Sequence, residues 1–246
     1  MFPIAPPEVL SELRRYDTPT VCNVLELLDI RPRTDGYTDR RIRACYPRLP
    51  PMVGYACTAT FRAGTPARDG DVYSGLSQQV ALLAEYPGPA VMVFQDTDDP
   101  MTAATFGEIM CTTYKAFGSV GLITSGAGRD LDQVEPLAYP CFTGGTIASH
   151  GYCQIGQLQV PVRVGGLTIY PGDLLHGDRN GISTIPVGYA ERVVEGCVGF
   201  MHAEAVILEY LRGDKLDPAG YAAARNECNR RVHELGVKLR AKPGKG

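Results

Sequence analysis

The spacing of apolar positions in the first quarter of the chain predicts two helices and then one strand. Residues 7–15 (PEVLSELRR) predict a short helix, and TPTVCNVLELL predicts a second. Thr18 is a good N-cap there, and Pro19 fits the first helical position. Residues 31–51 are rich in Arg and Pro, which predicts an irregular surface loop. The run VGYACTATF at 53–61 then predicts a strand.

The middle of the chain alternates between helical spacing and short apolar runs. Predicted helices cover 71–86 and 104–117, and predicted buried strands cover 90–94 and 120–124. After Pro140 the apolar runs become shorter and lie between Gly and Pro turns, which indicates a series of small strands.

Two long helices, at about 188–211 and 219–236, close the chain. Strand and helix alternation followed by small strands predicts a layered α/β or β/β/α domain with a helical tail. We expect one domain over residues 1–246, with a helical C-terminal extension from about residue 219.

Composition narrows the classes of protein that fit this pattern. The 246 residues are 44% apolar and 21% charged, as in ordinary globular proteins. No run approaches the roughly 18–20 apolar residues of a membrane helix, and the N-terminus lacks a signal-peptide profile, so we expect a cytoplasmic protein that does not enter a membrane. A net charge of −3 argues against a general nucleic-acid binder.

Lysine and cysteine usage limits the chemistry further. Of the five lysines, four lie in the last 32 residues, so only Lys115 could serve as a buried Schiff-base lysine. The other 19 basic residues are arginines, which suit fixed, bidentate binding of carboxylates. None of the eight cysteines forms a C-x-x-C pair, so we expect free thiols rather than a thiolate zinc site.

One constellation joins Gly107-Glu108 to Arg129-Asp130, which lie 22 positions apart. The predicted helix and strand between them would return the chain beside its starting edge. Two carboxylates and a guanidinium would then surround one cleft, next to helix-start amides that attract anions. Two alternatives stay open: the helix could begin near Thr102, or Arg129 and Asp130 could form an ordinary surface turn.

Two other motifs carry weaker signals. Asp173, His176 and Asp178 could be metal ligands, but such spacing is more typical of tight turns. The segment SGAGRD follows a strand and imitates a dinucleotide fingerprint, but Leu131 stands where the third glycine is needed. Pro136 also ends the next helix early, which argues against a nicotinamide or S-adenosylmethionine fold.

Five motifs together indicate a family. From Tyr16 to about Pro218 the chain resembles the RraA-like family, which includes the 4-hydroxy-4-methyl-2-oxoglutarate and 4-carboxy-4-hydroxy-2-oxoadipate aldolases. The motifs are TPTVCNVL, GEIMCTTYKAFGSVGLITSGAGRD, PVRVGGLTIYPGD, HGDRNGISTIP and EYLRGDKLD. The second is the most specific, because its Gly-Glu and Arg-Asp elements keep the family's spacing.

The resemblance implies a three-layer β/β/α fold of the phosphohistidine-swivelling type. It also implies a homotrimer, or a hexamer made of two trimers, with sites between neighbouring subunits. The implied cofactor is Mg²⁺ or Mn²⁺, and Asp130 matches the metal-binding aspartate. Arg129 matches the arginine that contacts the 2-oxo acid, and Glu108 matches an acidic residue that holds water beside the metal.

Two further matches concern the substrate and the neighbouring subunit. The amides of Gly107, Ile109 and Met110 match a helix start that binds the substrate carboxylate. Glu204 matches a glutamate that reaches the site of the next subunit. The resemblance therefore implies a catalytic set of Arg129, Glu108 and Glu204.

The implied chemistry agrees with the residue types. Cleavage of a 4-hydroxy-2-oxo acid between C3 and C4 leaves a pyruvate enolate, and a divalent cation can accept that charge where lysines are scarce. Arg129 would add a fixed positive group, and water polarised by the cation and Glu108 could accept the 4-hydroxyl proton. Decarboxylation of oxaloacetate gives the same enolate. We therefore expect a metal-dependent carbon–carbon lyase acting on small 2-oxo acids.

Two other functions compete with this interpretation. Some RraA-like proteins act without catalysis, by binding an RNA-processing nuclease. The presence of Glu108, Arg129 and Asp130 together favours an enzyme instead. The incomplete glycine fingerprint argues against a methyltransferase.

Overall fold

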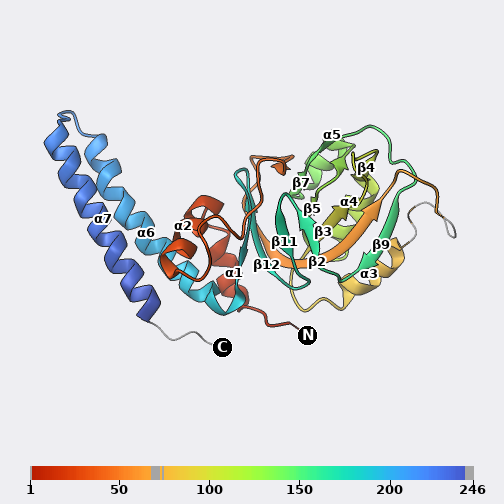
Figure 1. Ribbon diagram of the computed structural model, residues 1–246, viewed down its shortest axis with the longest axis horizontal. Helices are drawn as coiled ribbons and strands as arrows, with labels where there is room; N and C mark the ends of the chain where they lie inside the picture. The colour runs from red at the N-terminus through yellow and green to blue at the C-terminus, as the bar shows by residue number, and fades with distance from the viewer. Residues whose placement is uncertain (1, 68–72, 74, 242–246) are drawn as a thin grey trace.

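A central mixed sheet organises the fold (Figure 1). The computed structural model describes residues 2–67, 73 and 75–241. The strand order is β1-β7-β5-β3-β2-β12-β13, and β9 also pairs with β2. The strands are β1 (Arg43–Ala44), β2 (Met52–Arg62), β3 (Ala90–Asp96), β5 (Ser119–Thr124), β7 (Cys141–Thr143), β9 (Gln154–Leu158), β12 (Leu174–Asp178) and β13 (Gly181–Ile185).

Two small sheets and a set of helices surround the central sheet. The small sheets are β10 (Val162–Val164) with β11 (Leu167–Ile169), and β4 (Ala104–Phe106) with β6 (Ala127–Gly128) and β8 (Gly145–Thr146). The helices are α1 (Pro7–Leu13), α2 (Thr18–Leu28), α3 (Leu76–Ala84), α4 (Glu108–Ala116), α5 (Leu131–Val134), α6 (Ala190–Leu211) and α7 (Pro218–Ala241), with 3-10 turns at Glu135–Leu137 and Val187–Tyr189.

Alternate residues of the central strands pack into different layers, as the two-residue period of a strand requires. On β3, Met92 and Phe94 join the core under α3 and α4. Val91 and Val93 join a separate core with the β10–β11 hairpin. The order is therefore helices, central sheet and small sheet, which confirms the expected three-layer β/β/α fold.

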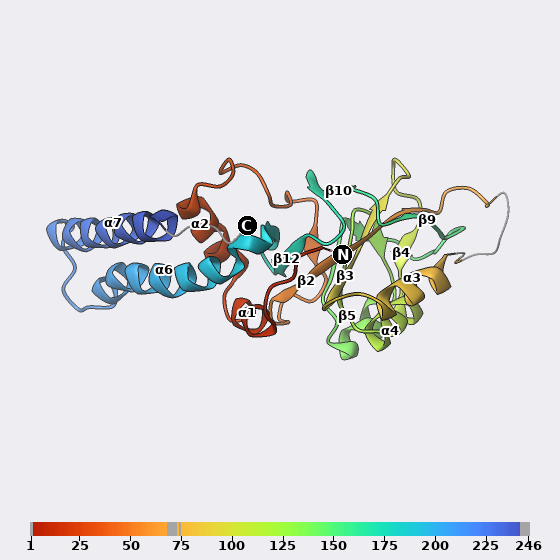
Figure 2. The same ribbon diagram turned by 90° about the horizontal axis from the view of Figure 1, so that it is seen from below.

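A third core attaches the terminal helices to one end of the sheet. Val53 and Tyr55 of β2 pack there with residues of α1, α2 and α6. The later part of α6 and the start of α7 extend beyond this core as a helical hairpin (Figures 1 and 2).

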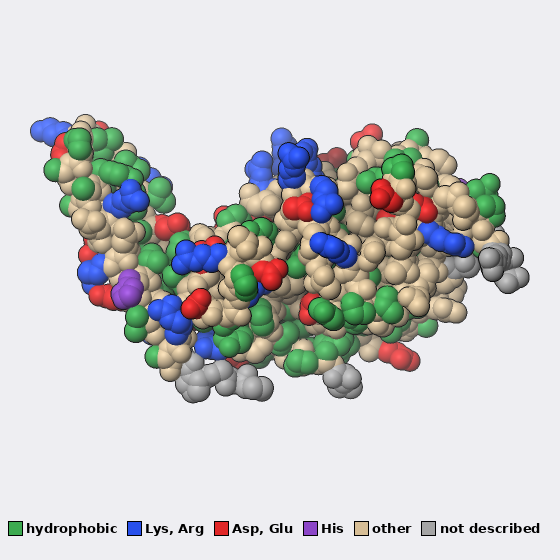
Figure 3. All heavy atoms as spheres, viewed as in Figure 1, with side chains coloured by type: hydrophobic (Ala, Val, Ile, Leu, Met, Phe, Trp, Pro, Cys, Tyr) green, Lys and Arg blue, Asp and Glu red, His purple; other side chains and the backbone are tan. Residues whose placement is uncertain are grey.

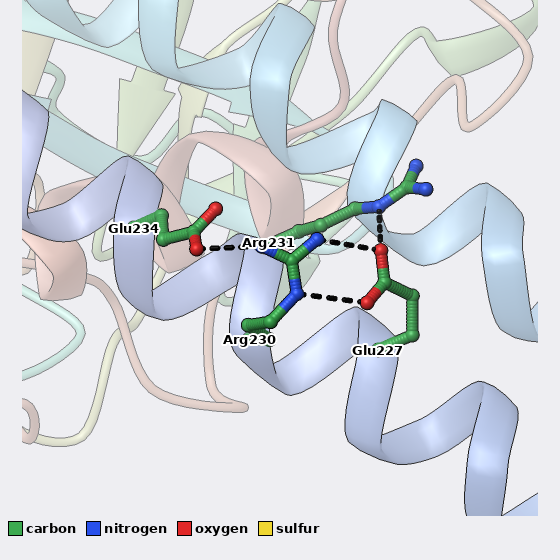
Figure 4. Close-up of polar contacts among 4 residues, drawn as sticks. All are labelled: Glu227, Arg230, Arg231 and Glu234. Atoms are coloured by element: carbon green, nitrogen blue, oxygen red, sulfur yellow. Dashed lines mark hydrogen bonds and ion pairs between the residues drawn. The ribbon is translucent and has the colours of Figure 1, made fainter.

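Several ion pairs form between neighbouring turns on the surface of α7 (Figure 4). Arg230 bonds Glu227 and Glu234, and Arg231 also bonds Glu227. Hydrogen bonds from the two arginines lower the pKa of Glu227 to about 2. Pairs three and four residues apart support a helix whose exposed faces are polar.

The structure corrects several predicted boundaries. Residues 104–106 of the predicted 104–117 helix are the strand β4, because the run Ala-Thr-Phe pairs with β6. The predicted 71–86 helix begins only at Leu76, and residues 71, 72 and 74 lie outside the described residues. The last helix extends to Ala241, past the predicted end at 236.

The structure also bears on the expectations about cysteines and membrane helices. All eight cysteines are free thiols, as predicted. Within the described part of the chain, no helix combines the length and apolarity that a membrane crossing requires.

Candidate active site

Three short parallel strands bring the predicted site residues to one edge. β4 pairs with β6 through Ala104–Ala127 and Phe106–Gly128, and β8 pairs with the other side of β6. The amide of Arg129 donates to the Phe106 carbonyl at 3.0 Å. Because parallel strands end at the same edge, Gly107 comes to lie beside Arg129 and Asp130. The predicted return of the chain is therefore confirmed.

Gly107 permits the close approach of these two segments. A Cβ at this position would lie 2.4 Å from Asp130 Oδ2 and 3.1 Å from Arg129 Nε. The first distance is well inside van der Waals contact, so any side chain would push the carboxylate away. Gly107 has an extended backbone that any residue can adopt, so the requirement is space rather than conformation.

Asp130 joins the two segments directly. Its Oδ2 accepts a hydrogen bond from the Glu108 amide at 3.1 Å and lies 3.7 Å from Arg129 Nε. Its backbone is left-handed, with φ of 56°, a conformation that Asp tolerates better than most residues. The carboxylate thus turns toward the start of α4 instead of capping its own helix α5.

The start of α4 gives the site an electropositive wall. The helix begins at Glu108 with Gly107 as N-cap, so the alternative start near Thr102 is wrong. The first-turn amides, including those of Ile109 and Met110, have no acceptor inside the helix and favour an anion. Ile109 is 77% exposed, whereas Met110 is buried and fixes the helix to the core.

A cavity of about 600 Å³ opens beside these residues. It is lined by residues 128–133 and 146–148, which follow β6 and β8. The Arg129 and Asp130 side chains are 28% and 36% exposed, so both face a partly solvated space that a small molecule can enter. Glu108 is exposed in the first turn of α4.

Tyr73 lies near Arg129, and no motif in the sequence pointed to it. Burial raises the pKa of the Tyr73 hydroxyl, while the nearby Arg129 guanidinium opposes that rise by charge and hydrogen bonding. The Tyr73 ring lies 5.5 Å from the His150 ring. Burial also raises the pKa of Cys153 to about 12, so this thiol stays protonated at neutral pH.

This donor set can hold a divalent cation only if water and substrate supply most of the ligands. The described residues contain no group of three His, Cys, Asp or Glu side chains that could enclose a metal. Asp130 therefore offers a single carboxylate, whose Oδ1 takes no hydrogen bond from the described residues. Mg²⁺ tolerates such a site, because it retains several waters and often takes one or two protein carboxylates with the substrate.

Glu204 lies apart from the other predicted site residues within a single chain. It lies on α6, on the other side of the molecule from α4 and α5 (Figure 1). Burial and the neighbouring charge of Asp17 raise its pKa. Its predicted role depends on a neighbouring subunit and stays a prediction.

The remaining candidates have structural partners. The Lys115 ammonium is exposed and donates to the Leu137 carbonyl, so it is no buried Schiff-base lysine. His176 is fully buried, with Nδ1 2.9 Å from Thr18 Oγ1. Asp178 accepts from the Thr18 amide, and Asp173 from the Tyr170 amide. His176 and Asp178 lie in strand β12 rather than in a turn, while Asp173 closes the turn before it.

The family model described as RraA-like, Aldolase/RraA, matches residues 18–183, which include the whole cavity edge. The chain belongs to the RraA-like family. A Halalkalibacterium halodurans relative, named provisionally as a 4-hydroxy-4-methyl-2-oxoglutarate aldolase, is 35% identical over 133 residues. That alignment covers 53% of this chain and 62% of the relative, so the matched part spans less than two thirds of the relative's length.

Solved RraA-like structures share the fold. An uncharacterized Pseudomonas syringae pv. tomato protein superimposes with a TM-score of 0.72 at 25% identity, covering 92% of this chain and 96% of that one. A Streptomyces coelicolor protein, described as an unusual member of the RraA family of RNase ES inhibitors, gives a TM-score of 0.67 at 24% identity. This second comparison covers 86% of this chain and all of the other, and it supports the fold alone.

Proposed function

We propose that this RraA-like protein is a divalent-metal-dependent lyase that cleaves a 4-hydroxy-2-oxo acid and also decarboxylates oxaloacetate. One observation carries the proposal: Arg129 and Asp130 line one cavity, and the Asp130 carboxylate contacts the start of α4 beside Gly107. The aldolase name of the Halalkalibacterium relative supports the same reaction class.

The residues have complementary tasks in this reaction. The free amides at the start of α4 bind the substrate carboxylate, because a helix N-terminus favours an anion. Arg129 donates to the 2-oxo oxygen and stabilises the negative charge that develops there as the C3–C4 bond breaks. Glu108 is placed in the first turn of the same helix, where it can accept the 4-hydroxyl proton through water.

Asp130 would hold the cation. When bound, Mg²⁺ or Mn²⁺ supplies Lewis-acid stabilisation of the enolate charge. The Glu108 amide and Arg129 orient the Asp130 carboxylate before any cation arrives. The Asp130 carboxylate would therefore already be in position before the cation binds.

Pyruvate release tests the proposal. The protein is incubated with oxaloacetate or 4-hydroxy-4-methyl-2-oxoglutarate, and pyruvate is followed by a coupled assay. We expect excess chelator to abolish pyruvate formation and added Mg²⁺ to restore it. Asp130→Asn should lower kcat by about a hundredfold or more, whereas Arg129→Ala should raise KM and lower kcat together. Full turnover in excess chelator would refute the metal requirement.

Two controls separate catalysis from folding. Asp214→Asn and Arg48→Ala remove exposed charges of the same kinds away from the cavity, and both should retain activity. Circular dichroism should give the same spectrum and melting temperature for all variants. Stoichiometric binding of an RNA-processing nuclease, with no turnover of either acid, would favour the regulatory function instead.

A further inference from the structure

Tyr73 adopts a backbone conformation that its residue type avoids. Its φ is 68°, in the left-handed region that bulky residues rarely adopt and glycine adopts freely. The main chain is held on both sides, because the Tyr73 amide donates to the Cys153 carbonyl at 2.9 Å and the Tyr73 carbonyl accepts from the Leu76 amide at 3.2 Å. Conformations of this kind persist where the surroundings enforce them, and they cluster at active sites. A tyrosine at a position that suits glycine indicates a role for its side chain.

The segment after β8 carries the contacts of Tyr73 to the candidate active site. Ile147 lines the same cavity as Arg129, and its amide donates to the Gly128 carbonyl at 3.2 Å, directly before Arg129. Three residues later, the His150 ring lies 5.5 Å from the Tyr73 ring. The chain that is bonded beside Arg129 therefore also packs against Tyr73.

The Arg129 guanidinium acts on groups from this segment and on Tyr73. Its charge opposes the rise in pKa that burial causes at the Cys153 thiol. At Tyr73, both the charge and a hydrogen bond of Arg129 oppose the same rise. A guanidinium has donors and no acceptor, so the Tyr73 hydroxyl oxygen accepts in this contact.

Arg129 has little else to fix its orientation. Among the described residues its ion-pair partner is Asp130, with 3.7 Å between Arg129 Nε and Asp130 Oδ2, which is too long for a hydrogen bond. A long side chain with one loose partner keeps much of its rotamer freedom. The visible face in Figure 3 carries few Lys or Arg side chains over the end of the molecule that holds α3, α4 and β9. The direction of the Arg129 charge therefore matters for this end of the fold.

We propose that Tyr73 is a positioning residue, whose hydroxyl accepts a hydrogen bond from Arg129 and holds the guanidinium toward the cavity. A neutral acceptor fixes the guanidinium without cancelling its charge, so the charge stays available to an anion in the cavity. The ring contact with His150 and the main-chain bonds of Tyr73 hold the hydroxyl in place. The catalytic consequence rests on the proposed function of Arg129, whereas the contact itself does not.

The contact is tested without substrate by a double-mutant cycle. Urea unfolding is measured at one protein concentration for the wild type, Tyr73→Phe, Arg129→Ala and the double variant. Tyr73→Phe removes the hydroxyl and keeps a ring against His150. We expect it to lower the urea midpoint of the wild type and to leave that of Arg129→Ala unchanged, because the partner is already absent. Equal shifts in the two backgrounds would overturn the proposed contact.

Steady-state pyruvate release tests the positioning role. We expect Tyr73→Phe to raise KM and lower kcat, so that kcat/KM falls about tenfold, because a misoriented Arg129 loses part of its contact with the substrate. The same substitution in Arg129→Ala should cause no further loss. Tyr73→Gly fits the backbone without strain and should lose at least as much activity as Tyr73→Phe. Wild-type KM and kcat in either single variant, or an equal loss in both backgrounds, would refute the positioning role.

A matched control and the two readouts separate this inference from the proposed function. Tyr170→Phe removes the hydroxyl of an exposed tyrosine after β11, and it should equal the wild type in both experiments. If no 2-oxo acid is cleaved but the urea midpoints are coupled, the Tyr73–Arg129 contact stands and the lyase does not. If pyruvate is released and Tyr73→Phe keeps the wild-type kinetics, the lyase stands and the positioning role does not.

Discussion

At the scale of single residues, the candidate site depends on an absent side chain. Gly107 allows the Asp130 carboxylate to reach the Glu108 amide, and it leaves Arg129 on the same side. The small size of Gly107 therefore matters for the proposed cation site, because the carboxylate that it leaves uncrowded is the one proposed to hold the cation.

Gly107→Ala tests this requirement. The added methyl group would lie 2.4 Å from Asp130 Oδ2, so the carboxylate must move away from the helix start. We expect kcat/KM for pyruvate release to fall by about a hundredfold, with a small change in the melting temperature. Wild-type activity in this variant would show that the contact does not matter.

Asp96 gives a prediction for the pH dependence of stability. Burial raises the pKa of its carboxyl to about 6, and Oδ2 is buried without a hydrogen-bond partner among the described residues. The unfolded chain loses this proton near pH 4 and the folded protein near pH 6. Asp96 therefore lowers the stability of the fold as pH rises through that window.

Urea denaturation of Asp96→Asn measures the effect. The neutral amide avoids burying a charge, so the variant should gain about 1 kcal/mol of unfolding free energy at pH 8, allowing for partial exposure of the carboxyl. At pH 4 the two proteins should be nearly equal. A gain of the same size at both pH values would assign the effect to packing rather than to charge.

At the scale of elements, apolar periodicity predicted the central strands and most helices correctly. It failed at β4, where the three residues Ala-Thr-Phe carry too little pattern to distinguish a strand from a helix start. Arg129 and Asp130 were predicted because their spacing from Gly107 implies a return of the chain. Tyr73 was not predicted, because it reaches Arg129 through a contact distant in sequence.

The packing of α6 gives a prediction at this scale. A Cβ on Gly196 would lie 2.3 Å from Val24 Cγ1 of α2. Gly→Ala in an exposed helix stabilises by about 1 kcal/mol. Here we expect Gly196→Ala to destabilise by about 1–3 kcal/mol, because the helices must separate. A raised melting temperature in differential scanning calorimetry would contradict the observed packing.

At the scale of the whole molecule, Glu204 belongs to the α6–α7 hairpin, which lies away from the cavity of the same chain. The predicted role of Glu204 therefore requires the trimer or hexamer that the family resemblance implies. Light scattering after size exclusion tests the assembly itself.

Mixed subunits test whether the site is shared. Arg129→Ala and Glu204→Gln chains should each be nearly inactive. When they are unfolded and refolded together in equal amounts, chance pairing places intact residues on both sides of about one site in four. Pyruvate formation should then recover to about a quarter of the wild-type rate. No recovery would show that Arg129 and Glu204 of neighbouring subunits do not form a shared site.

The link between the Glu108 amide and the Asp130 carboxylate bears on handling of the protein. Because a backbone amide rather than a bound ion holds the Asp130 side chain, removal of the metal with a chelating buffer should leave the fold and the metal site intact. Preparations made in such buffers should regain their full rate upon simple addition of the salt, without a refolding delay.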